Sequence, residues 1–355
     1  MNIEDFNRLT ETWNEENGRL VRDEAGLPSV MVPLRKMKSA ELHPDLPDRT
    51  HPAWIVKGKE VETVWVSKYE NVIVDGMAYS LPGQAPATHI SFDEAVEACR
   101  KKGRGWGLMP ASLWAVIALW CKRNQCLPHG NNNYGEDIYD SSQKGEGAVF
   151  SEFRPDSILL TKTGSGPAAW SHNGKEDGIY DLNGNVFEWQ AGLRTVKGEI
   201  QVIPNADCMD PGVSLDADSR AWKAFDINGE LISPDREKSL KTDFGGVFGA
   251  AYIWKAGPHL DSQMNTARYC EFRNMKAELP KVPDSLKELI LFPADAPDSY
   301  LKDYFYTANL LEEGIAMRGG SFASERIAGM FTTGMNMKRT DRSLHIGFRS
   351  VYYEL

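Results

Sequence analysis

The feature of this 355-residue sequence that most constrains its fold is a helical stretch, residues 112–123, that is apolar on nearly all sides. A helix with apolar side chains all around its axis is buried rather than laid on a surface. The apolar positions are Leu113, Trp114, Val116, Ile117, Leu119 and Trp120. The ten tryptophans of the chain also require layers of structure on more than one side. The fold must therefore place other elements around residues 112–123.

A second helix is predicted from Ser91 to about Gly103. Ser91 can cap its first turn, Glu94 occupies the capping-box position three residues later, and Gly103 can terminate it. Strand-like segments occur at residues 30–34, 53–56, 62–67, 68–74, 186–189, 194–197 and 199–203. The turns at 57–60 and 197–198 predict that their flanking strands form hairpins.

The domain organisation follows from shifts in composition. Residues 1–52 are predicted to form an N-terminal extension, and residues 53–355 the main domain. Within that domain, residues 205–300 are predicted to be an insertion of acidic loops with a helical patch at 279–291. Because helices and strands are mixed without regular alternation, the chain is assigned to the α+β class.

Composition excludes several functional classes. The net charge of −10 provides no basic footprint, so no nucleic-acid partner is expected. The first residues lack a basic and an apolar region, so we expect no signal peptide, and no apolar run is long enough for a membrane span. The five cysteines are scattered without a CxxC pair, which favours reduced thiols in a protein made in the cytoplasm.

The closing stretch, residues 316–355, is predicted to be a display surface. It begins with Arg-Gly-Gly-Ser-Phe at 318–322 and ends with Ile-Gly-Phe-Arg at 346–349. Between these ends, residues 323–344 show no steady period of 2 or 3.6. Phe331, Ile346 and Phe348 are the expected core anchors. An irregular segment held at both ends is typical of a recognition surface.

Several motifs in order resemble the formylglycine-generating-enzyme (sulfatase-modifying-factor) family. Residues 107–114 (Gly-Leu-Met-Pro-Ala-Ser-Leu-Trp), 181–189 (Asp-Leu-Asn-Gly-Asn-Val-Phe-Glu-Trp), 318–322 and 347–349 carry the resemblance. It implies a C-type-lectin-like fold with small twisted antiparallel sheets, two main helices and many loops over about residues 53–353.

The enzymatic chemistry of that family does not come with the motifs. Its oxidase needs two cysteines shortly after the Arg-Gly-Gly-Ser element, and residues 323–330 contain none. Serine does not replace a thiolate as a soft-metal ligand. A related branch uses histidine ligands for iron, but His43 and His51 fall in a proline-rich loop. We therefore expect a protein that is not an enzyme, although a metal-dependent oxidoreductase with an unrecognised site stays open as an alternative.

A third branch of the same fold fits the closing stretch, and it comprises the variable proteins of diversity-generating retroelements. The pattern of that branch resembles the Arg-Gly-Gly at 318–320, the Ala-Gly-x-Phe at 328–331 and the Ile-Gly-Phe-Arg at 346–349. The resemblance implies a noncatalytic, phage- or prophage-encoded receptor-recognition protein, located in a virion tail fibre or tip or otherwise displayed on a surface. Its partner would be a host or cell-surface protein or glycan. A purely structural virion subunit is the other alternative, and the oligomeric state is left open.

The candidate ligand-binding residues lie between the constant ends and mix small, polar, cationic and apolar types. They are Ser321, Ala323, Ser324, Arg326, Ile327, Thr332, Thr333, Asn336, Met337, Lys338, Asp341, Leu344 and His345.

No cofactor is expected, and a structural calcium ion is the one metal considered. The side-chain oxygens of Asp181, Asn183, Asn185 and Glu188 are of the type that calcium binds. Bracing of turns and pairing with an arginine is the alternative role for the same residues.

Overall fold

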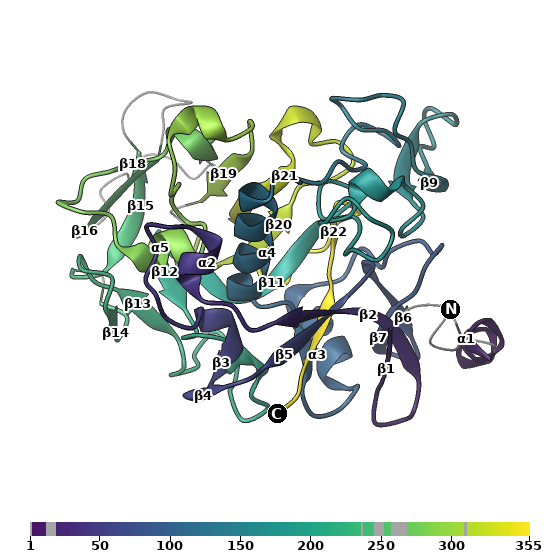
Figure 1. Ribbon diagram of the computed structural model, residues 1–355, viewed down its shortest axis with the longest axis horizontal. Coiled ribbons are helices and arrows are strands. Elements are labelled where there is room, and N and C mark those ends of the chain that lie inside the picture. The colour runs from purple at the N-terminus through teal and green to yellow at the C-terminus, as the bar shows by residue number, and fades with distance from the viewer. Residues whose placement is uncertain (1, 12–18, 236, 245–251, 257–267, 309–310) are drawn as a thin grey trace.

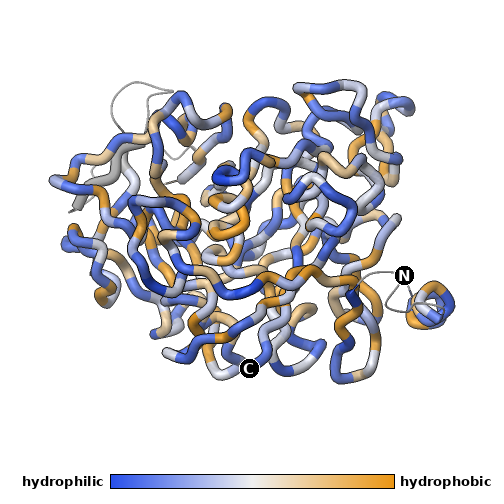
Figure 2. Tube along the Cα trace, in the orientation of Figure 1, coloured by the Kyte–Doolittle hydropathy of each residue, from blue (hydrophilic) through white to orange (hydrophobic). Residues whose placement is uncertain are grey.

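The computed structural model describes residues 2–11, 19–235, 237–244, 252–256, 268–308 and 311–355. Helix α4 lies near the centre of the molecule (Figure 1), and Figure 2 shows hydrophobic residues concentrated along it and along the strands beside it. The α-helices are α1 (Ile3–Thr10), α2 (Ser39–Leu42), α3 (Phe92–Arg100), α4 (Ala111–Arg123) and α5 (Asp284–Glu288).

The apolar helix predicted at 112–123 is confirmed as α4. Its side chains are buried from Ala111 to Leu119 and again at Cys121. It contacts α2, α5 and strand β11 (Phe187–Val196). Each large apolar side chain buried in this way contributes roughly 1.5–3 kcal/mol to stability. The helix thus packs against the neighbouring sheet through β11.

The capping box predicted at the second helix is also confirmed. The backbone N–H of Glu94 donates to the Ser91 hydroxyl at 3.4 Å, and the Ser91 N–H donates to the Glu94 carboxylate at 2.9 Å. These bonds satisfy donors that the first turn of α3 would otherwise leave unpaired.

A five-stranded antiparallel sheet joins the two ends of the described chain. Its order is β1–β2–β5–β23–β8, and its strands are β1 (Leu20–Arg22), β2 (Pro28–Arg35), β5 (Thr63–Ser67), β23 (Ser350–Tyr353) and β8 (Trp106–Leu108). Strand β2 contains the strand predicted at 30–34 and is hydrogen-bonded to β5. The proposed boundary at residue 52 is therefore not visible as a break in this sheet.

The hairpin predicted from residues 53–56 and 62–67 is wrong in its pairing. Strand β3 (Ile55–Val56) turns back at once onto β4 (Lys59–Glu60), whereas β5 pairs with β2 and β23. Strand β6 (Asn71–Val74) forms its own hairpin with β7 (Met77–Ser80). The turn at Lys57 was recognised, but the long-range partners of β5 carry no local sequence signal.

Within the described residues, the larger sheet has twelve strands, and its strand β11 packs against α4. Its main order is β17–β19–β21–β20–β11–β12–β15–β16–β18, with β13, β14 and β22 joined at its sides. The remaining bounds are β12 (Glu199–Val202), β13 (Lys223–Phe225), β14 (Leu231–Ile232), β15 (Leu240–Phe244), β16 (Tyr252–Ala256), β17 (Arg268–Glu271), β18 (Lys276–Ala277), β19 (Tyr304–Thr307), β20 (Gly314–Gly319), β21 (Gly329–Met337) and β22 (Ile346–Gly347). The hairpin predicted at 197–198 is confirmed as the turn between β11 and β12.

The expectation of an irregular middle for the closing stretch is wrong. Strand β21 occupies nine residues of it and lies inside the large sheet between β19 and β20. Its residues are buried from Gly329 to Met335. A strand covered on both faces shows no alternation of polar and apolar residues. That is why its period could not be seen in the sequence.

The predicted insertion at 205–300 contributes strands β13 to β18 and α5, so it extends the large sheet rather than forming only loops. Parts of it, residues 236, 245–251 and 257–267, lie outside the described residues. A separate hairpin of β9 (Gly147–Phe150) and β10 (Ile158–Thr161) completes a mixed α+β architecture of largely antiparallel sheets and few helices. In the described part of the chain, no helix has the length and hydrophobicity needed to cross a bilayer.

Candidate functional site

The closing stretch is anchored by a fully buried ion pair between Arg349 and Glu188. One guanidinium nitrogen of Arg349 (Nη2) lies 2.7 Å from a Glu188 carboxylate oxygen, and both side chains have an exposed fraction of 0%. The guanidinium also donates to the carbonyl oxygens of Ser67 and Tyr180, each at 2.8 Å. Burial raises the pKa of Glu188, and the nearby Arg349 charge opposes that shift. The pair fixes the end of the stretch to β11.

Two more buried carboxylates surround this ion pair. Burial raises the pKa of Glu70 well above its usual value, and it raises the pKa of Asp181 to about 6. The Asn185 side-chain amide donates to Glu70, and Asn131 donates to the Asn185 oxygen. Asn185 and Glu188, two of the four residues considered above as calcium ligands, thus take part in contacts within the protein, and the calcium site stays a prediction. Among the described residues, no group of three or more His, Cys, Asp or Glu is arranged to hold a metal ion.

The predicted core anchors are confirmed. Phe331, Ile346 and Phe348 are buried. The indole N–H of Trp114 on α4 donates to the Met330 carbonyl at 2.9 Å, which ties β21 to the central helix. Strand β21, which follows the turn at the candidate site, is thus fixed to the central helix.

The turn at residues 321–328, which joins β20 to β21, is held by backbone bonds to two other loops. The Phe322 N–H donates to the Asn185 carbonyl at 3.0 Å, and the Glu325 N–H donates to the Asn132 carbonyl at 2.7 Å. Gly320 has a φ of +89°, and a Cβ there would lie 2.6 Å from the Cβ of Ala328. Only glycine allows this close turn. The turn is therefore fixed rather than free.

Aromatic rings gather around this turn. The rings of Phe322 and His345 are stacked with centroids 4.5 Å apart, and Tyr134 meets Phe322 edge-on at 5.7 Å. The Ser321 hydroxyl lies 3.0 Å from the His345 Nδ1 atom. Burial of part of the ring lowers the pKa of His345, which favours neutral imidazole. Tyr134 remains 45% exposed, so this group offers aromatic surface to a partner.

A second exposed tyrosine extends the aromatic surface. The Arg326 guanidinium lies 5.6 Å from the centre of the Tyr139 ring, and Tyr139 is 45% exposed. Beneath them, the buried carboxylate of Asp303 accepts a bond from the Phe331 N–H at 2.8 Å. Burial raises the pKa of Asp303 to about 7. Arginine and tyrosine side chains in this arrangement are typical of binding hot spots.

The structure divides the candidate ligand-binding residues by exposure. The exposed residues are Arg326, Lys338 and His345, and the partly buried ones are Ala323, Ile327, Asn336, Met337, Asp341 and Leu344. The buried ones are Ser321, Ser324, Thr332 and Thr333.

Four residues of the predicted set are buried in the structure. Thr332 and Thr333 lie in β21 with an exposed fraction of 0%, and the Thr332 hydroxyl accepts a bond from the Tyr304 N–H. Ser324 accepts a bond from the Ser321 N–H inside the turn. Side chains covered in this way offer little surface to a ligand. The ligand-contact role of the whole set stays a prediction.

The remaining candidates form two separate groups. Ala323 and Leu344 pack with Phe322 at the turn, close to His345. Asn336, Met337, Lys338 and Asp341 instead lie at the far end of β21 and just beyond it. At about 3.3 Å per residue, that end is about 26 Å from the start of the strand. The loop there is tied to α3, since Arg339 and Arg342 pair with Asp93 and Glu94.

Sequence reasoning missed Tyr134 and Tyr139, which complete the surface at the turn. Both lie in a glycine- and asparagine-rich loop that the sequence showed to be irregular. Aromatic residues in an irregular loop do not belong to the apolar face of a helix or strand. That position was the signal in the sequence that these two side chains could be exposed. Their proximity to residues 321–328 depends on the tertiary fold.

No protein-family model matches this chain, and the comparison with curated proteins finds no match. Among solved structures, Treponema denticola variable protein 1 is similar at a TM-score of 0.33 with 11% identity, covering 94% of this chain and 98% of that one. The Major Tropism Determinant U1 variant is similar at a TM-score of 0.30 with 10% identity, covering 90% of this chain and 55% of that one. Similarity at this level does not place the chain in a family.

Proposed function

We propose that this protein is a noncatalytic recognition protein that binds its ligand through the surface around the 321–328 turn. We define this recognition surface by its accessible side chains, which are Tyr134, Tyr139, Ala323, Arg326, Ile327, Leu344 and His345. The observation that carries the proposal is that these side chains are accessible while the backbone of the turn is held in place. Ala323, Arg326 and Ile327 lie on a turn that is bonded to two neighbouring loops and precedes a strand anchored to α4. The other residues of the surface lie in neighbouring loops around this turn.

Such an arrangement suits binding for two reasons. A fixed backbone reduces the entropy lost when a partner is bound. Tyrosine and arginine provide large, polar-tipped contact area and are enriched among residues that dominate binding energy. The side chains of the turn can also change without altering the buried frame, which supports a surface that is diversified between copies of the gene.

The finer parts of the proposal follow the sequence resemblance. The ligand is a host or cell-surface protein or glycan, the gene is carried by a phage or prophage, and the C-type-lectin-like fold presents the surface. A reverse-transcriptase gene beside this one, and a near-copy of the segment coding for 318–349 that differs mainly at adenines, would support diversification.

The experiment compares cell binding of the labelled wild type with a triple variant, Tyr139→Ala, Arg326→Ala and His345→Ala. We expect at least a tenfold loss of affinity, about 1.4 kcal/mol, with an unchanged melting temperature. Arg104→Ala is the matched control, because Arg104 is an exposed arginine two residues before β8 and lies outside the recognition surface. Lys338→Ala tests the second group of candidates separately.

The alternatives give different results. Binding that survives the triple variant would remove recognition from this surface and favour a structural subunit. Stoichiometric copper or iron in purified protein, together with oxygen consumption, would favour the oxidoreductase.

A further inference from the structure

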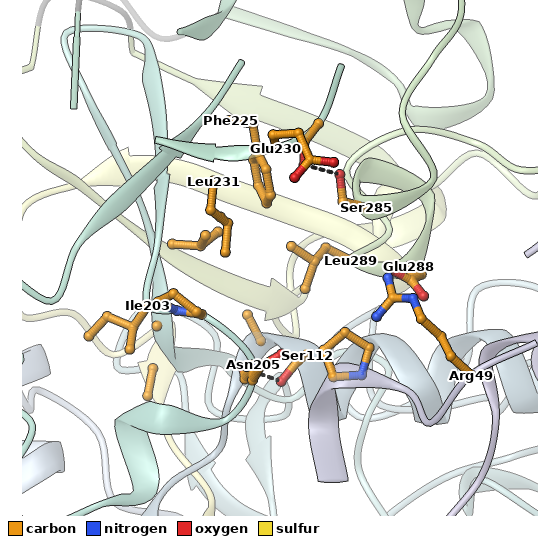
Figure 3. A pocket seen from close by; sticks show the side chains of 17 residues that line it. Arg49, Ser112, Ile203, Asn205, Phe225, Glu230, Leu231, Ser285, Glu288 and Leu289 are labelled. Carbon is orange, nitrogen blue, oxygen red and sulfur yellow. Dashed lines mark hydrogen bonds and ion pairs between the residues drawn. The ribbon is translucent and has the colours of Figure 1, made fainter. Parts of the chain in front are cut away.

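A cavity of about 330 Å³ lies on another part of the molecule, between α4, β12, β14 and α5. Figure 3 shows Ser112 and Asn205 at one side of it and Phe225 and Leu231 at the other. None of the residues of the recognition surface lines it. Whatever it binds is therefore independent of the function proposed above.

The cavity has polar and apolar walls, and the apolar wall is formed by several large side chains. Phe225, Leu231 and Leu289 face one another across it (Figure 3), and Val202 and Ile203 of the β12 region add to the lining. An engineered cavity of about 150 Å³ is enough to bind benzene. This cavity has roughly twice that volume and lies within the range of small-ligand sites. It is suited to a body of two fused rings or a similar compact hydrocarbon.

Two of the charged side chains lining the cavity neutralise each other. The Arg49 guanidinium lies 2.7 Å from the Glu288 carboxylate, and Glu288 has an exposed fraction of 1%. The Ser39 hydroxyl donates to the other oxygen of Glu288 at 2.5 Å. Both oxygens of Glu288 are therefore engaged, and the pair adds no net charge to the cavity.

The third charged side chain is Glu230, an exposed residue just before β14. Within the described residues, its carboxylate forms neither a hydrogen bond nor an ion pair, and only its backbone is bonded, to Asp226. The lining thus has a net charge of −1, from Arg49, Glu288 and Glu230. An uncompensated carboxylate beside the apolar wall formed by Phe225, Leu231 and Leu289 favours a cationic head group on an apolar body.

We propose that this cavity binds a small primary amine with an aromatic or similarly compact apolar body. The ammonium group pairs with Glu230, and the body lies against Phe225, Leu231 and Leu289. The aromatic face of Phe225 adds to the attraction for a cation nearby. The neutral ion pair of Arg49 and Glu288 also lines the cavity and offers no free carboxylate to a second positive charge on the ligand.

The test uses three probes that share one apolar body and differ in charge: 2-naphthylmethylamine, 2-naphthylmethanol and 2-naphthoate. Binding to the full chain is measured by calorimetry at pH 7, where the amine is protonated. We expect affinity to fall in the order amine, alcohol, acid, with the amine about tenfold tighter than the alcohol.

Two variants locate the site. Glu230→Gln is expected to lower the affinity for the amine to that for the alcohol, whereas Glu237→Gln, an exposed glutamate outside the cavity lining, leaves it unchanged. Ser285→Phe places a ring in the cavity and is expected to abolish binding of all three probes. Because Glu230 is exposed, its variant tests the proposal even if Ser285→Phe fails to fold.

Three results would overturn the proposal. They are tighter binding of the acid than of the alcohol, an unchanged amine affinity in Glu230→Gln, and no saturable binding of any probe up to roughly 1 mM. None of them bears on the recognition surface, whose variants are assayed on cells.

Discussion

Replacing Arg349 with methionine would remove the cation at the centre of a buried cluster of three carboxylates. The change leaves Glu188 without its ion-pair partner and leaves the carbonyl oxygens of Ser67 and Tyr180 without donors. Breaking a buried pair by removing one member costs about 3–5 kcal/mol. Domains of this kind are stabilised by about 5–15 kcal/mol in total. We therefore expect Arg349→Met to lose about a fifth or more of the stability.

The assay is urea unfolding followed by fluorescence, comparing midpoints at equal m values. Glu188→Gln and the double variant complete a double-mutant cycle. The double variant is expected to recover part of the loss, because it contains no unpaired charge at this position.

The pH dependence of the Arg349→Met variant provides a second measurement. Burial already raises the folded-state pKa of Glu188, and loss of Arg349 raises it further. An acid with a raised folded-state pKa stabilises the protein at low pH and loses that contribution as the pH rises through the folded-state value. The variant should therefore regain stability as the pH falls from neutrality toward the ordinary range of a glutamate. A loss below about 1 kcal/mol, or one independent of pH, would refute the reasoning.

Three further predictions concern the same frame. Asp181→Asn should stabilise the protein by roughly 2–3 kcal/mol at pH 8, with no gain near pH 3.5. The reason is that burial raises the Asp181 pKa from 3.8 to about 6, so the wild type loses stability when this carboxylate is ionised. Thermal melts at the two pH values measure the difference. Arg318→Met should raise the free energy of unfolding by about 1 kcal/mol or more, measured by urea unfolding. The reason is that the guanidinium is fully buried and its Nε and Nη1 atoms have no hydrogen-bond partner in the described structure. A lower free energy of unfolding would contradict this prediction. Gly320→Ala should cost at least about 2 kcal/mol and weaken ligand binding, since its Cβ would meet that of Ala328; an unchanged melting temperature would show that the turn can relax.

Local chemistry explains which elements could be predicted from the sequence. Helix α4 was evident because a helix with apolar residues all around has few alternatives to burial. Helix α3 was evident because Ser91 and Glu94 satisfy its first turn within four residues.

The elements that were missed depend on distant partners. Strand β5 was seen as a strand, but its pairing with β2 and β23 spans the whole chain. Strand β21 was missed because both of its faces are covered, which removes the alternation that marks a strand.

The candidate site was predicted only in part for the same reason. Its constant ends were correctly recognised as anchors, since Arg349 and Phe348 are buried. Exposure within the segment could not be inferred, because it depends on which strands lie beside β21. Tyr134 and Tyr139 reach the turn from a loop almost two hundred residues earlier in the chain, at a distance that only folding closes.

The position of β23 in the five-stranded sheet has a consequence for how the gene tolerates change. Residues 350–353 are translated after the recognition segment, yet they occupy an inner position between β5 and β8. A reading-frame shift anywhere in the codons for 321–345 would also replace Arg349 and β23, and the sheet would lose an interior strand. We expect substitutions at the accessible positions of that region to leave the five-stranded sheet intact, whereas out-of-frame insertions and deletions should yield a chain that does not fold. A frame shift in residues 321–345 is therefore expected to remove the fold together with the surface around the turn.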